Sequence, residues 1–277
     1  MDIVKAFNAA SRDPELKLRY DGMRSITPDT KNEYLSKFDN VSDRGFAEKV
    51  LNSTIYVPGN VLLEELNRSF DSFADKIGND SFYIFVPKEK FSSEHIFTIH
   101  LWNKIIRKNF IKFINVDSDV KDGTNVIIID DCIYTGNNTL NTIDQMTYNN
   151  KNKTINFHLI IPYVSYWGKI AITGFKNRLQ FPVLNFYDKI RIINFFAIPE
   201  NEIYEGMIDK FRLQYHHQVA IYFDHKVANE FSTFDSIYLR GIIPGQKDYG
   251  LLINYPPDTD LKNRIYNKYF VGLNLFT

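Results

Sequence analysis

Apolar residues recur at helical spacing in the first part of the chain. Pro58, Gly59 and Asn60 open the clearest segment, and Gly78 closes it. Between them the apolar positions are Leu62, Leu63, Leu66, Phe70, Phe73 and Ile77. This spacing predicts one long amphipathic helix. Two shorter helices are predicted at Pro28–Phe38 and Arg44–Leu51, so residues 1–78 are expected to form an N-terminal helical extension.

After Gly78, short apolar runs alternate with amphipathic stretches. The predicted strands are Ser81–Val86, Phe113–Val116, Asn125–Ile129, Ile155–Pro162 and Ile190–Ala197. The predicted helices are Ser93–Lys108 and Asn138–Tyr148. This alternation is typical of a mostly parallel sheet flanked by helices on both faces. We therefore expect an α/β core over residues 79–200, with ligands bound beyond the carboxyl ends of its strands.

The pattern changes again from about Glu200. Val219–Phe223 has the apolar character of a strand, and Phe231–Gly245 is rich in turn-forming and aromatic residues. We expect residues 201–277 to form an appended C-terminal lobe packed on the core.

Charge and cysteine usage restrict the classes of partner and compartment. The 277 residues include 33 basic and 33 acidic side chains, so net charge provides no attraction to a nucleic-acid backbone. No apolar run approaches the roughly 18 residues that span a bilayer. The single cysteine, Cys132, excludes an internal disulfide and fits a reducing compartment. We expect a cytoplasmic protein with a small-molecule substrate and neither a membrane nor a nucleic-acid partner; a homodimer is compatible with the sequence.

The segment most informative about chemistry is residues 125–140, which read Asn-Val-Ile-Ile-Ile-Asp-Asp-Cys-Ile-Tyr-Thr-Gly-Asn-Asn-Thr-Leu. A predicted buried strand delivers Asp130 and Asp131 into a turn at Thr135 and Gly136 that starts a helix. Backbone N–H groups and the helix dipole at such a turn attract an anion. Adjacent carboxylates can accept hydrogen bonds from vicinal hydroxyls. The combination suits a sugar phosphate.

This segment resembles the phosphoribosyl-pyrophosphate (PRPP) motif of type I phosphoribosyltransferases. The resemblance implies that Asp130 and Asp131 are the catalytic carboxylates, holding the ribose 2′- and 3′-hydroxyls. It implies that the 5′-phosphate is bound by Thr135, Gly136, Asn137, Asn138 and Thr139. The Tyr-Thr-Gly form is closer to the pyrimidine-operon regulator branch than to the hypoxanthine–guanine branch, which usually has Asp at the place of Tyr134. We assign Tyr134 to the acceptor side of the site.

The carboxylate pair has two other interpretations. An apolar strand ending in Asp-Asp also occurs in NTPases, where it holds magnesium, but those proteins need a Gly-x-x-x-x-Gly-Lys-Ser/Thr loop that this chain lacks. The alternative that stays open is a capped strand–helix junction without a ligand.

A second strand–loop–helix unit follows Ser81–Pro87. In the family, the loop at this place binds pyrophosphate. The resemblance therefore assigns positive charge there to Lys88 and Lys90, and hydrogen bonds at the helix start to Ser92 and its neighbour Ser93. A solvated loop that ends in an ordinary N-cap is the alternative.

A third candidate lies in the C-terminal lobe, which the resemblance makes the hood over the acceptor. Residues 222–234, which include Asp224, His225 and Lys226, resemble an element of poorly characterised phosphoribosyltransferase-like proteins of bacteria and large DNA viruses. The resemblance places these three side chains at the acceptor or pyrophosphate. A charge cluster at a strand end is the alternative.

Three features depart from the family pattern. Asn138 stands where Thr or Ser is usual, unless the turn is one residue longer. Asp117–Thr124 is only a short turn, although a family enzyme often carries a flexible lid there. The strand Phe157–Ser165 lacks the base-contacting Lys of the hypoxanthine–guanine branch.

The function implied is transfer of phosphoribosyl from PRPP to a nitrogenous acceptor with release of pyrophosphate. Mg²⁺ would be the cofactor, carried by PRPP and not bound directly by the protein. The rival functions are a non-catalytic regulator that binds PRPP or a nucleotide on the same fold, and a structural protein whose site is inactive.

Overall fold

The computed structural model describes residues 3–14, 16, 28–36, 41, 44, 45, 48, 55–88, 92–133, 136–165, 168, 169, 171, 172, 174, 183–186, 191–193, 221–223, 226, 227 and 263–273. The chain divides into two compact units. Unit 1 comprises Met1–Leu18, Val61–Ile192 and Thr259–Thr277, and unit 2 comprises Arg19–Asn60 and Ile193–Asp258. Each unit therefore combines segments from more than one of the three ranges expected from the sequence, which were 1–78, 79–200 and 201–277.

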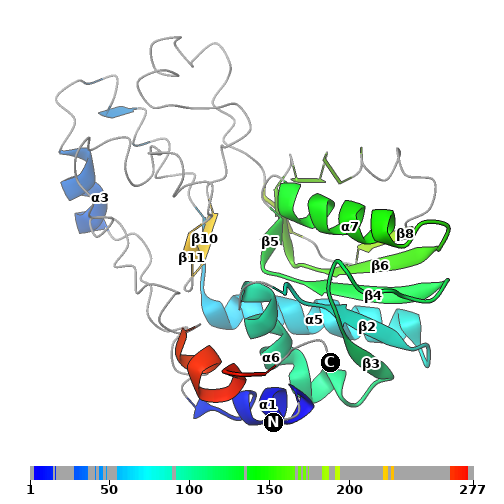
Figure 1. Cartoon of the computed structure of the whole chain (residues 1–277). Helices are drawn as coiled ribbons and strands as arrows, with labels where there is room; N and C mark the ends of the chain where they lie inside the picture. Colours follow the sequence, from blue (N-terminus) through cyan, green and yellow to red (C-terminus); the bar gives the residue numbers. More distant parts are fainter. Residues whose placement is uncertain are drawn as a thin grey trace. The chain divides into compact units, whose positions relative to one another are not determined.

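A five-stranded parallel sheet forms the centre of unit 1 (Figure 1). Its strands, in spatial order, are β3 (Phe110–Ile114), β2 (Phe82–Phe85), β4 (Thr124–Ile129), β6 (Ile155–Ile160) and β8 (Val183–Phe186). Residues 126–129 are buried, as expected for an apolar run in a strand covered on both faces. The predicted α/β fold with a parallel sheet is therefore confirmed.

The last strand position differs from the expectation. The sequence indicated one strand at Ile190–Ala197, whereas the last strand of the sheet is β8. In β8, Asn185 interrupts the apolar sequence. The short strand β9 (Arg191–Ile193) belongs to a second sheet with β5 (Cys132–Ile133) and β7 (Tyr163–Ser165). Residues 191–193 of the predicted run thus belong to a different sheet from the one predicted.

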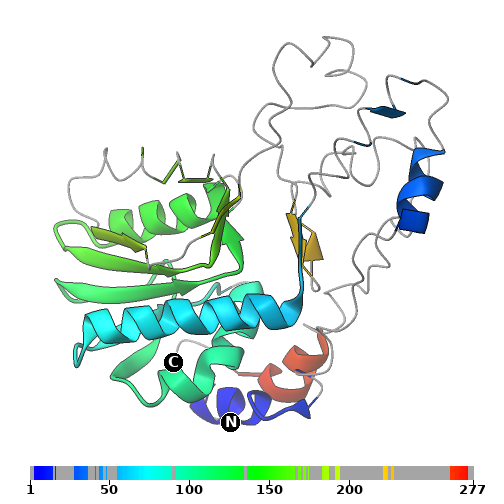
Figure 2. The ribbon, with the colours of Figure 1, turned by 180° about the vertical axis from the view of Figure 1, so that it is seen from behind.

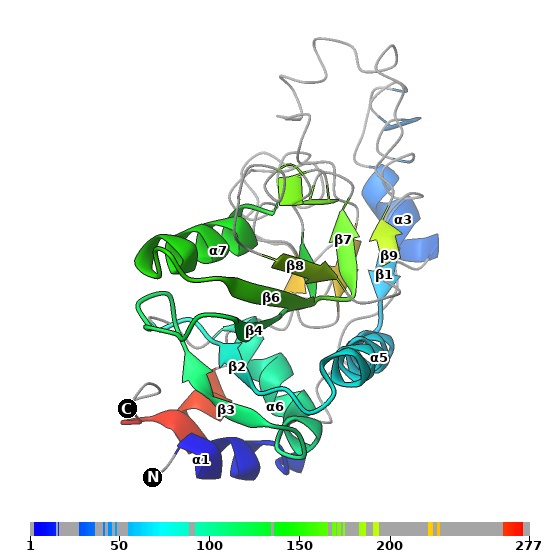
Figure 3. The same ribbon diagram turned by 90° about the vertical axis from the view of Figure 1, so that its right-hand side faces the viewer.

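Helices cover both faces of the parallel sheet (Figures 1 and 3). On one face α7 (Asn137–Asn149) contributes Ile143 and Met146 to the same buried cluster as Ile128 and Phe157. On the other face lie α5 (Gly59–Ile77) and α6 (Ser93–Ile105), and Figure 2 shows α5 running across it. Phe73 of α5 packs edge-on against Phe82, with ring centroids 5.3 Å apart. The predicted long helix is present as α5, and it covers one face of the sheet.

Segments from the two ends of the chain pack beside β3 and α6. Phe7 of α1 (Ile3–Ala10) lies 4.5 Å from Phe113 and 5.1 Å from both Trp102 and Phe270, between ring centroids. Phe270 ends the short π-helix η4 (Tyr266–Phe270). No helix was predicted at residues 3–10, because its buried face is completed by aromatic residues far away in the sequence.

A buried carboxylate joins the same two segments. Asp13 is 2% exposed, and its Oδ2 accepts hydrogen bonds from Lys268 Nζ at 2.9 Å and Tyr269 OH at 2.6 Å. The bond to Asp13 raises the pKa of Lys268, and burial together with the bond to Asp13 raises the pKa of Tyr269. The pairing satisfies a charge that would otherwise be costly to bury.

Unit 2 contains helix α3 (Pro28–Leu35) and a small sheet. Strand β1 (Ile55–Val57) pairs in parallel with β10 (Ile221–Phe223), which pairs antiparallel with β11 (Lys226–Val227). The strand predicted near Val219–Phe223 and the helix predicted from Pro28 are present. Among the described residues, no helix combines the length and apolar character that a membrane crossing requires.

Candidate functional site

The strand order of unit 1 singles out one edge of the sheet. Strand β2 lies between β3 and β4; the chain leaves β2 through α6 on one face and leaves β4 through α7 on the other. The sheet therefore changes winding direction between β2 and β4. Open α/β sheets bind ligands outside the carboxyl ends of the strands at such a switch point. The residues that follow β2 and β4 are the candidates.

Asp130 and Asp131 directly follow the carboxyl end of β4. The N–H of Asp130 donates to the carbonyl of Ile160 at 3.3 Å, which extends the pairing with β6 to this residue. Oδ1 of Asp130 accepts the N–H of Asp131 at 2.9 Å. Asp130 is half-buried and Asp131 is fully buried. The structure thus brings the two predicted carboxylates together at the switch point.

Gly136 begins the helix that follows this pair. Its φ of +85° is in the left-handed region, which favours glycine. A Cβ at this position would lie 3.3 Å from Cβ of Ala171 and 3.6 Å from the carbonyl oxygen of Gly168. The sequence therefore needs glycine here for both backbone conformation and space.

The first turn of α7 has the features of an anion site. The N-cap residue, Gly136, has no side chain with which to cap the helix, and the first turn carries no acidic residue that would neutralise the positive dipole end. Asn137 and Asn138 are exposed and Thr139 is half-buried. These three predicted phosphate-binding residues lie where the prediction placed them; Tyr134 and Thr135 lie outside the described residues.

The start of α6, after β2, is closed by a capping box that the sequence pattern did not predict. Ser92 is the N-cap, and its backbone N–H donates to Nδ1 of the buried His95 at 3.1 Å. Ser93 donates through its hydroxyl to Oε2 of Glu94 at 3.4 Å. The signal was present as a Ser followed three residues later by a polar side chain, but the usual third residue is Glu or Gln.

Lys88 lies between the end of β2 and this cap. Its exposed Nζ is 3.5 Å from Oδ2 of Asp117. An ion pair between exposed side chains contributes at most about 1 kcal/mol, so a stronger anion can displace it. Lys90, the other predicted pyrophosphate contact, lies outside the described residues.

The predicted hood residues belong to unit 2. Lys226 is in β11, paired with Phe223, and its side chain is outside the described part of the structure, as are Asp224 and His225. That these three residues face the carboxyl ends of the parallel strands stays a prediction.

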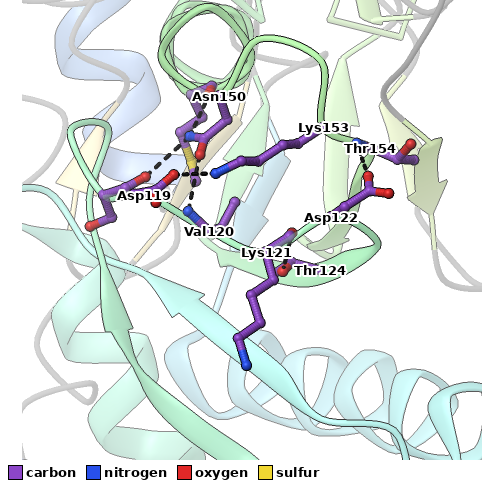
Figure 4. A network of polar contacts seen from close by, with 10 residues as sticks. Asp119, Val120, Lys121, Asp122, Thr124, Asn150, Lys153 and Thr154 are labelled. Carbon is purple, nitrogen blue, oxygen red and sulfur yellow. Dashed lines mark hydrogen bonds and ion pairs between the residues drawn. The ribbon is translucent and has the colours of Figure 1, made fainter.

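The turn before β4, at the place of the family's lid, is held at the opposite edge of the sheet (Figure 4). The buried Asn150 accepts the N–H of Val120 at 3.0 Å and donates to the carbonyls of Ser118 and Met146 at 3.1 and 3.0 Å.

Two further contacts join this turn to the residues before β6. The N–H of Thr154 donates to Asp122 at 2.6 Å, and Lys153 pairs with Asp119. The turn therefore meets β4 at its amino end, and the six residues of β4 separate it by roughly 20 Å from Asp130.

One buried histidine lies in the sheet away from the switch point. His158 of β6 is in register with Ile127, and its Nε2 is 3.1 Å from Oδ1 of Asn125. Burial, with a smaller contribution from the charge of Lys76, lowers the pKa of His158 to about 4. His158 is thus neutral near pH 7 and serves packing and hydrogen bonding within the sheet.

Comparison with known proteins gives one family and one structural likeness. The family model described as PRTase-CE matches residues 31–236. Among solved structures, adenine phosphoribosyltransferase from Thermoanaerobacter pseudethanolicus ATCC 33223 is similar at 12% identity with a TM-score of 0.27, covering 46% of this chain and 83% of that one. No curated protein matches the chain.

Proposed function

Because the chain belongs to the PRTase-CE family of type I phosphoribosyltransferase-like proteins, we propose that it transfers phosphoribosyl from PRPP to a nitrogenous acceptor. The observation that carries the proposal is the junction after β4. There, two adjacent carboxylates and a helix start whose N-cap is a left-handed glycine lie together at the switch point of the sheet.

The junction suits the two ends of a ribose 5-phosphate. The first turn of α7, with Thr135 before it, binds the 5′-phosphate through backbone N–H groups and the helix dipole. Asp130 and Asp131 accept hydrogen bonds from the ribose hydroxyls. Bonds to a charged acceptor contribute about 1.5–3 kcal/mol each.

The reaction is a displacement at C1 of the ribose. The lone pair of the acceptor nitrogen forms the new bond to C1, while the bond from C1 to the pyrophosphate oxygen breaks and its electron pair leaves with pyrophosphate. Positive charge that develops on the sugar is favoured by the nearby carboxylates, and positioning supplies much of the rate.

The leaving group is bound after β2. Lys88 and Lys90 supply positive charge to pyrophosphate, and Ser92 supplies a hydrogen bond. Mg²⁺ carried by PRPP would neutralise the leaving group further, with its oxygen ligands supplied by PRPP and not by the protein. Tyr134, Asp224, His225 and Lys226 are assigned to the acceptor side.

A second candidate function is a non-catalytic regulator that binds PRPP or a nucleotide. The observation that favours it is the turn at residues 117–124, which is held at the amino end of β4 by Asn150 and Asp122. A regulator needs only the PRPP half of the site. A transferase must in addition exclude water from C1.

Two measurements on the full chain separate these functions. Calorimetric titration with PRPP and Mg²⁺ tests the site, and pyrophosphate release with a panel of purine, pyrimidine and other nitrogenous acceptors tests transfer. Binding with release supports the transferase, and binding without release supports the regulator. Absence of PRPP binding contradicts the transferase and a regulator that binds PRPP.

A further inference from the structure

The cap of α6 has an unusual acceptor. The backbone N and the Oγ of Ser92 each lie 3.1 Å from the same atom, Nδ1 of His95. His95 is fully buried, and it occupies the third helical position, where capping boxes ordinarily have Glu or Gln. The backbone N–H and the hydroxyl of Ser92 are therefore both directed at one imidazole nitrogen.

The chemistry of that nitrogen limits what it can accept. To accept the N–H of Ser92, Nδ1 must carry its lone pair, so the ring proton of neutral His95 is on Nε2. A neutral imidazole nitrogen offers one lone pair, whereas a Glu or Gln oxygen offers two. The N–H and the O–H of Ser92 therefore compete for one lone pair. The hydroxyl can donate to another acceptor while the bond from the N–H to Nδ1 still caps the helix.

The position of Ser92 indicates what that acceptor is. Helix α6 starts at the edge reached by the carboxyl end of β2, on one side of the switch point, and Lys88 belongs to the same connection. An oxyanion bound there meets a lysine charge, a helix start and a hydroxyl proton. Hydrogen bonds from such donors to charged oxygens are the stronger ones.

We propose that His95 is a positioning residue for the pyrophosphate end of the substrate. Its Nδ1 holds the backbone N–H of Ser92 and so fixes the start of α6, while the hydroxyl of Ser92 rotates from Nδ1 to a pyrophosphate oxygen. This inference rests on the proposed function and adds to it a residue that does not itself touch the ligand.

Three variants of the full chain test the inference. His95→Leu removes the acceptor, His95→Gln retains an acceptor of the capping-box type, and Thr98→Val is the control. Thr98 is buried one turn further along α6 and donates to the carbonyl of Glu94 at 2.6 Å, so its loss perturbs the helix without touching Ser92.

The readout is the dissociation constant of pyrophosphate with Mg²⁺, measured beside that of PRPP and the melting temperature. His95→Leu is expected to weaken pyrophosphate binding by about tenfold, which corresponds to one modest hydrogen bond. His95→Gln should restore most of the affinity, and Thr98→Val should change stability only. Equal losses in His95→Leu and Thr98→Val would overturn the positioning role.

A measurement on the unmodified protein covers the case in which His95→Leu does not fold. The ¹⁵N resonance of His95 Nδ1 is expected to shift when pyrophosphate binds, because the hydroxyl of Ser92 leaves it, while Nε2 keeps its proton. Pyrophosphate binding without such a shift overturns the inference and leaves the proposed function intact. Absence of binding by both PRPP and pyrophosphate overturns the two together.

Discussion

The backbone N–H of Asp131 donates to Oδ1 of Asp130 at 2.9 Å, which ties two adjacent carboxylates at the end of β4 to each other. Their surroundings nevertheless differ, since Asp130 is half-buried and Asp131 is fully buried. Asp130 is thus accessible from solvent, with one oxygen already oriented by the backbone. If the site binds PRPP as proposed, the ribose contacts Asp130 at the protein surface and Asp131 at a buried position.

Replacing Gly136 should remove phosphate binding. Gly136→Val forces a left-handed φ on a β-branched residue, at a cost of at least about 1–2 kcal/mol, and places new atoms against Ala171. The matched control is Gly123→Val, because Gly123 has a φ of +74° but open space around it, at the amino end of β4. Phosphorus NMR titration with inorganic phosphate should show loss of binding in the first variant only. Retained binding by Gly136→Val would remove the turn from the site.

Asn150 should matter for stability and not for the ligand. Asn150→Ala leaves the buried N–H of Val120 without its partner, at about 1–3 kcal/mol, and removes one hydrogen bond to the carbonyl of Ser118; the carbonyl of Met146 keeps the backbone N–H of residue 150. The control, Asn149→Ala, loses one exposed bond to the carbonyl of Val116 and should cost less than about 1 kcal/mol. Urea unfolding measures both, and PRPP affinity should be the same in each folded variant. A selective loss of affinity in Asn150→Ala would mean that the turn before β4 communicates with the site.

His158 should make the fold sensitive to mild acid. Its pKa is lowered to about 4 in the folded protein, against 6.5 for the ordinary side chain, so the unfolded chain binds the proton more readily. The contribution of His158 to the free energy of unfolding is therefore fully present above about pH 6.5. It decreases by about 3 kcal/mol as the pH falls from there toward about 4. Denaturant midpoints measured from pH 4 to 7 check this. The denaturant midpoint should depend less steeply on pH in His158→Leu. An unchanged dependence on pH would assign the acid sensitivity to other groups.

Lys226 distinguishes a transferase from a regulator. If Lys226 contacts pyrophosphate or the acceptor mainly in the transition state, Lys226→Ala should lower turnover more than PRPP affinity. Lys151→Ala serves as the charge-matched control, because Lys151 follows α7 at the amino edge and lies 4.1 Å over the ring of Tyr148. Equal losses of turnover and affinity in Lys226→Ala would indicate a simple ligand contact, and no loss would return this segment to the interpretation as a strand-end charge cluster.

The interior strands could be predicted from the sequence because burial on both faces leaves a continuous apolar run. The strand predicted at Asn125–Ile129 is β4 at Thr124–Ile129, and the following carboxylates lie where a parallel sheet must place them. The prediction of the edge strand β3 was less accurate. It was expected at Phe113–Val116 but runs over Phe110–Ile114, where Lys112 interrupts the apolar run.

Features that depend on distant partners could not be predicted. The helix at Ile3–Ala10 is completed by Trp102, Phe113 and Phe270, which no local pattern connects to it. His95 has the sequence context of an ordinary core or surface histidine, because its role as a cap depends on a rotamer that brings Nδ1 to Ser92. The anchoring of the turn before β4 likewise depends on Asn150, thirty residues away along the chain from Val120.

The most direct test of the central claim is the affinity for PRPP with Mg²⁺ of the Asp130→Asn/Asp131→Asn double variant. Asp71→Asn/Asp119→Asn is the charge-matched control, because both of its carboxylates are exposed and pair with lysines. Calorimetry should show binding by the wild type and the control, and a loss of at least about 1.5–3 kcal/mol in the site variant, with its fold verified by circular dichroism. A folded site variant that binds PRPP as tightly as the wild type would contradict the assignment of Asp130 and Asp131 to the ribose.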